Sequence, residues 1–129
     1  MRIVDIILRL ERHLNQAKKV VNEDLSNYYI FNTLAMECFQ TVNSLIELGE
    51  FIVSEKRLGF PSTYSEIFEL LYKHKIIDET TLKVFKRLIF LRNLIAHEYY
   101  KIEEKDLKEM VSLFKYVEKF LEKIKREFL

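Results

Sequence analysis

The chain contains very little glycine and proline. Only two glycines and one proline occur in 129 residues, and there is no tryptophan. Glycine and proline supply most tight turns, so their scarcity argues against the hairpins and corners of a small β-sheet protein. Apolar residues make up 49% of the chain and charged residues 32%, a balance that suits long helices. The composition predicts an all-α fold, and the length fits one domain, residues 1–129.

Cysteine and histidine are also scarce. The single cysteine, Cys38, cannot form an internal disulfide, which suits a reducing compartment. Together with three scattered histidines, it cannot assemble a zinc site of ordinary spacing. We therefore expect no structural metal and no cofactor.

A strong net charge and long apolar runs are absent as well. The net charge of +1 excludes the global positive field that dominates non-specific nucleic-acid binding, so any RNA contact must use a local patch. The N-terminal segment MRIVDIILRLERHL has a charge every few residues, unlike a signal peptide or a membrane span. We expect a cytoplasmic protein without membrane contact.

Apolar spacing predicts four long helices and one short one. The first spans residues 3–21, and the second starts after residue 27 and ends near Gly59 and Pro61. The short helix opens with a capping box, formed by Thr63 and Glu66, and runs through Tyr72.

The fourth helix follows Asp78, its expected N-cap, and is apolar in nearly every direction, as in a helix surrounded by others or by a partner. The last helix spans residues 106–128 with regular heptad spacing. We expect these helices to form an antiparallel bundle. The heptads also permit a coiled coil, but they are short and the breaks between helices are sharp.

The strongest functional signal is the segment RNLIAHEYY, residues 92–100, at the end of the fourth helix. It places Arg92, Asn93, His97 and Tyr99 at Arg-x4-His-x-Tyr spacing. A guanidinium always carries charge and presents a fork of donors to phosphate, and an imidazole readily takes or gives a proton near neutrality. Together they are the groups needed to cut a phosphodiester without metal.

The spacing sets a geometric condition on this motif. Five residues along a regular helix separate Arg92 and His97 by about 140°, whereas Asn93 and His97 share a face. Arg92 and His97 can meet only if the helix distorts or ends near Ala96, or if the long arginine reaches across. Asn93 can then orient the imidazole or donate to a phosphate oxygen.

Arg92 also needs a partner, because a cation among apolar neighbours costs several kcal/mol if it is buried alone. The partner is either an acidic side chain of the second helix, Glu37 or Glu47, or a bound phosphate. The sequence favours neither.

Two further sets of polar residues are candidates. Gln40, Asn43 and Glu47 follow one polar line of the second helix and are candidate supporting partners of the motif, although an exposed stripe explains them equally well.

The second set is basic. Lys83, Lys86 and Arg87 precede Arg92 with no carboxylate between positions 82 and 97, so they are either RNA contacts or a solvated face. His13 and His74 lie among charged residues and are expected to be structural or solvated.

These residues resemble the HepT-like toxins of the HEPN superfamily. The resemblance spans residues 27–120 and includes the segment Gly-Phe-Pro-Ser-Thr-Tyr at 59–64 as well as the motif at Arg92, His97 and Tyr99. It implies an α-helical homodimer, with catalytic clefts at the subunit interface, that cleaves RNA as a metal-independent endoribonuclease. Arg92 and His97 would be its catalytic pair and Asn93 a helper.

The resemblance also implies a partner and a means of control. A minimal nucleotidyltransferase antitoxin would silence the toxin by adding AMP to the motif tyrosine, in a type VII-like toxin–antitoxin pair. By spacing that tyrosine is Tyr99, with Tyr100 as its neighbour.

Two other functions fit the same residues. A HEPN-type bundle can serve as a non-catalytic binding module that positions substrates for a nucleotidyltransferase. A purely structural helical dimer, in which Arg92 pairs with an acid and His97 caps the fourth helix, would bind RNA only weakly and in a salt-sensitive way.

Overall fold

A computed structural model describes residues 2–129, and within that range every regular element is helical. The elements are α1 (Arg2–Val20), α2 (Tyr28–Glu55), α3 (Tyr64–Lys73), α4 (Glu79–His97), the 3-10 helix η1 (Tyr99–Lys101) and α5 (Glu104–Phe128). The predicted all-α fold, with four long helices and a short one, is confirmed. None of the helices in this range combines the length and the apolar character that crossing a membrane requires.

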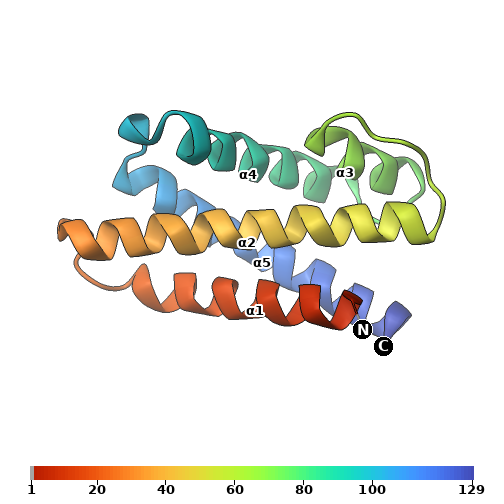
Figure 1. Cartoon of the computed structure of the whole chain (residues 1–129), viewed down its shortest axis with the longest axis horizontal. Helices are drawn as coiled ribbons and strands as arrows, with labels where there is room; N and C mark the ends of the chain where they lie inside the picture. The colour runs from red at the N-terminus through yellow and green to blue at the C-terminus, as the bar shows by residue number, and fades with distance from the viewer. Residues whose placement is uncertain (1) are drawn as a thin grey trace.

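The helices form an antiparallel bundle around α2 (Figure 1). The longest helix, α2, contacts α1, α3, α4 and α5, and α5 also packs against α1 and α4. Both chain ends lie at the same end of the bundle (Figure 1). The C-terminal half of α4 lies against the middle of α2, where Arg92 meets Phe39 and Asn43, residues far from it in the sequence.

The core is built from the apolar stripes of all five α-helices. Leu10 of α1, Leu45 of α2 and Phe114 of α5 have no exposed surface. The rings of Phe68, Phe85 and Phe120 form an edge-to-face series with centroids 5.2 and 5.5 Å apart, joining α3, α4 and α5. This packing fixes α4, and therefore the motif at its end.

Side-chain caps set the helix starts. Asp78 accepts a hydrogen bond from the N–H of Thr81 and begins α4, as predicted. Thr63 accepts from the N–H of Glu66, but the Glu66 carboxylate returns to Ser62 instead of Thr63.

The last helix begins earlier than expected. It starts at Glu104 instead of 106, because Glu103 is its N-cap and Asp106 completes a reciprocal capping box.

The loop between α2 and α3 starts sooner than the sequence suggested. Arg57 has a φ of 53°, and the N–H of Leu58 donates to the carbonyl of Val53. This is a Schellman end, in which a left-handed residue satisfies the last carbonyls of a helix. The helix α2 therefore ends at Glu55, before Gly59 and Pro61.

Candidate functional site

A cavity of about 560 Å³ opens beside the C-terminal half of α4. Arg92, Asn93 and His97 line it from α4, Glu50 lines it from α2, and residues 61–65 close it from the loop and the start of α3. We call it the Arg92 cavity. The structure thus brings the arginine, the asparagine and the histidine of the motif into one open space.

The length of the arginine side chain, not a distorted helix, makes this possible. The helix α4 is continuous through His97, and the N–H of Glu98 still donates to the carbonyl of Leu94 at 2.8 Å. A distortion near Ala96 does not occur. Arg92 reaches the cavity from its own side of α4, while Asn93 and His97 face it together.

Neutral partners hold Arg92. Its Nε donates to Oδ1 of Asn43 at 2.7 Å, and its Nη1 donates to Oδ1 of Asn93 at 2.9 Å. Its guanidinium lies 4.9 Å from the ring centre of Phe39 and 5.3 Å from that of Tyr64. Stacking between two rings is favourable for a guanidinium and leaves its charge intact.

Neither acidic side chain considered as a partner of Arg92 pairs with it. Glu37 pairs with Nδ1 of His13 at 2.8 Å, and Glu47 pairs with Arg2 and Arg9. Basic side chains of α1 attract both carboxylates away from α4. The guanidinium is therefore oriented without being neutralised, and its remaining N–H donors can bind an anion.

The three polar residues predicted to lie along one line of α2, Gln40, Asn43 and Glu47, have different partners. Of the three, Asn43 hydrogen-bonds to Arg92, whereas the Gln40 amide lies 3.8 Å from the sulfur of Met36 and Glu47 pairs with Arg9 of α1.

The basic residues that precede the motif do not line the Arg92 cavity. Lys86 pairs with Glu69 of α3, and Arg87 forms a two-point ion pair with Glu109 of α5 at 2.7 and 2.9 Å. Acids that are distant in the sequence offset the positive potential expected from this run. Lys83 remains exposed on the first half of α4.

Tyr99, the motif tyrosine, does not line the Arg92 cavity. It lines a second cavity of about 350 Å³ with Asn32, Met36 and Phe39, which we call the Tyr99 cavity. Its hydroxyl donates to Oδ1 of Asn32. Burial raises the pKa of the Tyr99 hydroxyl above its ordinary value, and the charge of Tyr28 adds to the rise.

Phe39 lies close both to Arg92 and to the Tyr99 cavity. One face of its ring packs under the Arg92 guanidinium, and the residue also lines the Tyr99 cavity. Tyr100 is 81% exposed, twice the 40% of Tyr99. Within one chain, the motif tyrosine and the arginine therefore share Phe39 as a neighbour.

Sequence reasoning missed three residues at this site. Tyr64 and Phe39 both stack on Arg92. Glu50 is the one carboxylate among the residues that line the Arg92 cavity. Only Tyr64 had a local signal, the Gly-x-Pro-x-x-Tyr spacing of the preceding loop.

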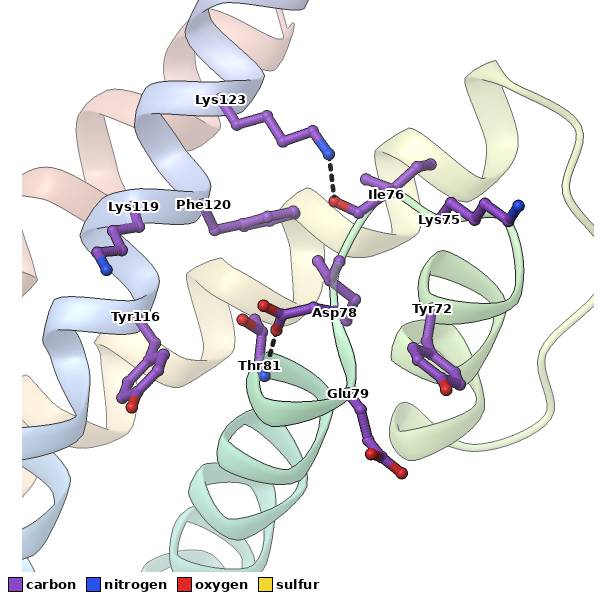
Figure 2. Close-up of a pocket in the computed structure, with 11 residues that line it drawn as sticks. Tyr72, Lys75, Ile76, Asp78, Glu79, Thr81, Tyr116, Lys119, Phe120 and Lys123 are labelled. Atoms are coloured by element: carbon purple, nitrogen blue, oxygen red, sulfur yellow. Dashed lines mark hydrogen bonds between the residues drawn. The ribbon is translucent and has the colours of Figure 1, made fainter.

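Another open cavity, of about 590 Å³, lies at the opposite end of α4, but its polar groups hold the fold together (Figure 2). Lys123 donates to the carbonyl of Ile76 at 2.6 Å, and Asp78 caps α4. Across residues 2–129, no three His, Cys, Asp or Glu side chains gather as a metal ion would require. The Arg92 cavity is therefore the best candidate for a site.

The sequence matches the family described as HepT-like, Ribonuclease HepT-like, over residues 3–124. The chain belongs to this family. No curated protein matches it.

Several solved structures share the fold. The tri-AMPylated HEPN toxin of Shewanella oneidensis, solved in complex with an MNT antitoxin, is 21% identical, with 96% of each chain covered and a TM-score of 0.85. A toxin–antitoxin solved with AMP-PNP is 18% identical, with 96% of this chain and 97% of that chain covered and a TM-score of 0.88.

The Bacillus subtilis cytosolic protein YutE, of unknown function, is 16% identical, with 98% of this chain and 87% of that chain covered and a TM-score of 0.88. Together these likenesses confirm the HEPN-like fold predicted from the motif.

Proposed function

We propose that this protein is a metal-independent endoribonuclease, the toxin of a type VII-like toxin–antitoxin pair that acts in the cytoplasm. One observation carries the proposal: in a member of the Ribonuclease HepT-like family, Arg92, Asn93 and His97 line one open cavity. The shared fold of a toxin solved with an MNT antitoxin supports the pairing with a nucleotidyltransferase.

The proposed reaction is attack of a ribose 2′-hydroxyl on the adjacent phosphorus. The bond to the 5′-oxygen of the next nucleotide breaks, leaving a 2′,3′-cyclic phosphate and a free 5′-hydroxyl. Arg92 would stabilise the charge that grows on the phosphate oxygens, and its fixed orientation means that little reorganisation is needed. His97 would transfer a proton, with Asn93 on the same face to orient it.

A second subunit completes this site. One imidazole cannot easily act in the same step as the base for the 2′-hydroxyl and as the acid for the leaving oxygen. A two-fold dimer would place two His97 side chains and two Arg92 forks around one phosphate.

We propose the face around the Tyr99 cavity as the dimer contact. Met36 is 52% exposed there, and Tyr28 and Tyr29, at the start of α2, are 74% and 77% exposed. Apolar and aromatic side chains grouped beside the active-site helix suit a subunit interface. This face also adjoins the exposed end of α4, which carries His97.

Tyr99 is the proposed AMP acceptor. Its hydroxyl donates to Asn32, and a phenol remains protonated near neutral pH, so the nucleotidyltransferase would supply the base that removes its proton. AMP on Tyr99 would put a bulky anion in the cleft between subunits, where it would occupy the space and the positive charge meant for RNA.

Cleavage of RNA by variants tests the proposal. Arg92→Ala and His97→Ala, in folded protein with divalent metal chelated, should each lower the cleavage rate by at least about a hundredfold and relieve growth inhibition. His74→Ala is the control, because this exposed histidine lies outside the Arg92 cavity. A native chain that binds the nucleotidyltransferase but cuts no RNA would instead support the non-catalytic binding module.

A further inference from the structure

A further cavity, of about 700 Å³, adjoins the Arg92 cavity. Glu50 and Pro61 line both, so the two spaces share a wall. This further cavity is otherwise lined by the end of α2 and by the loop that follows it, including Arg57 and Phe60. Its volume is ample for one nucleotide.

Phe60 is the most exposed large apolar side chain among residues 2–129, at 102% of its reference area. The loop that carries it is anchored on both sides. Before it, the N–H of Leu58 donates to Val53, and Gly59 packs so closely that an added Cβ would lie 3.2 Å from Leu70. The ring is thus held out in solvent by a fixed backbone.

The part of the loop that follows Phe60 is anchored too. The N–H of Ser62 donates to the Glu66 carboxylate at 3.1 Å. Gly59 has a φ of 148°, a backbone conformation that residues other than glycine rarely adopt, so the loop geometry depends on this residue.

Arg57 supplies a positive charge beside the ring. Within residues 2–129 its guanidinium forms no ion pair, whereas the neighbouring Lys56 pairs with Glu127 at 3.7 Å. An exposed aromatic ring together with an available arginine is the usual combination for single-stranded nucleic acid, since bases stack on rings and arginines bind phosphates.

We propose that Arg57 and Phe60 form a second nucleotide subsite of the RNA strand whose scissile phosphate lies at Arg92 and His97. Phe60 stacks on the base of a neighbouring nucleotide, and Arg57 binds that nucleotide's phosphate. Glu50, on the shared wall, repels phosphate and accepts a hydrogen bond from a base amino group. The inference rests on the proposed function and restricts the substrate to unpaired RNA, because a duplex keeps its bases stacked on one another.

A tryptophan reporter tests the subsite directly. The chain has no tryptophan, so Phe60→Trp introduces the only indole. In a His97→Ala background the protein is titrated with a single-stranded 2′-O-methyl RNA, which cannot be cut, while the anisotropy of the labelled RNA reports binding. Indole fluorescence should be quenched over the concentrations at which anisotropy rises. Phe90→Trp, at an exposed phenylalanine that lines neither cavity, is the matched control and should stay unchanged.

Each result of the titration supports or overturns the proposed subsite. Binding of RNA with unchanged fluorescence of the Phe60→Trp variant overturns the subsite and leaves the proposed function standing. A fluorescence change that follows protein concentration in the absence of RNA overturns it in favour of a contact between copies of the chain. If the native chain neither binds nor cuts RNA, both the subsite and the proposed function fail.

Affinity measurements separate the two residues. Phe60→Ala should weaken RNA binding by about five-fold to a hundred-fold, and Phe60→Tyr should restore it. Arg57→Gly, which suits the left-handed backbone, should reduce the slope of log affinity against log salt by about 0.7. Arg12→Ala, at an exposed arginine of α1, should leave the affinity nearly unchanged. Native affinity and salt slope in Phe60→Ala and Arg57→Gly would overturn the proposal.

Discussion

Arg92 and Asn43 lie on facing helices, and Nε of the arginine donates to Oδ1 of the asparagine at 2.7 Å. The acceptor is neutral, so it fixes the plane of the guanidinium without competing for its charge. Two acids of the same helix, Glu37 and Glu47, instead pair with side chains of α1. The hydrogen bonds that orient Arg92 therefore come from neutral amides, and Glu50 is the one carboxylate that lines the same cavity.

Replacing Asn43 should separate orientation from charge. Asn43→Ala leaves Arg92 positive but less well placed, and should lower the single-turnover cleavage rate by about tenfold to a hundredfold. Asn43→Asp keeps an acceptor but pairs the guanidinium with an anion. This variant should cleave RNA more slowly and bind it more weakly than Asn43→Ala. Gln40→Ala, one turn away, is the control, because the Gln40 amide is directed to the sulfur of Met36. Native activity in Asn43→Asp would contradict the role given to the neutral partner.

Replacing Tyr99 should uncouple the toxin from its control. Tyr99→Phe keeps the packing against Phe31, whose ring centre is 6.4 Å away, but removes the AMP acceptor. Intact mass after co-expression with the nucleotidyltransferase should show no added AMP, while RNA cleavage continues. Tyr100→Phe should still be modified. AMP on the Tyr99→Phe variant would assign the modification to another residue.

Gly49 permits the close approach of α2 and α3. A Cβ there would lie 2.8 Å from Cγ2 of Ile67 and 3.1 Å from the ring of Phe68, both buried. Gly49→Ala should therefore lower the free energy of unfolding by about 1–3 kcal/mol, measured by urea denaturation. Ser54→Ala, on the exposed face of α2, should leave it nearly unchanged. An unchanged urea midpoint for Gly49→Ala would show that α3 can move away freely.

The cap of α4 should make stability depend on pH in acid. The hydrogen bond from the Thr81 N–H lowers the pKa of Asp78 below its ordinary value of 3.8. Because the folded pKa is the lower one, the stabilisation is fully present above 3.8 and is lost as the pH falls below 3.8 and through the folded pKa. Asp78→Asn caps without titrating, so its free energy of unfolding should fall less steeply in this window. Urea titrations near neutrality and below pH 3.8 measure the difference, and parallel losses in native protein and variant would contradict it.

Much of the fold was predictable because its signals are local. The heptad spacing, the capping residues Thr63 and Asp78 and the scarcity of glycine all act over a few residues. The start of α5 was missed because both members of its capping box are acidic, Glu103 and Asp106, instead of the usual hydroxyl and acid pair.

The surroundings of the motif were less predictable because they depend on residues far apart in the chain. Lys86 and Arg87 have no acid near them in sequence, yet Glu69 and Glu109 reach them from other helices. The stacking of Phe39 and Tyr64 on Arg92 likewise joins three helices. Periodicity places such residues on a face but does not say which neighbour they meet.

The most direct test of the central claim is the chemistry of the RNA ends. Purified native protein should cut single-stranded RNA with divalent metal chelated, leaving 2′,3′-cyclic phosphate and 5′-hydroxyl ends, and the His97→Ala variant should not. Cleavage that requires added metal, ends of another chemistry, or full activity in the folded His97→Ala variant would contradict the account.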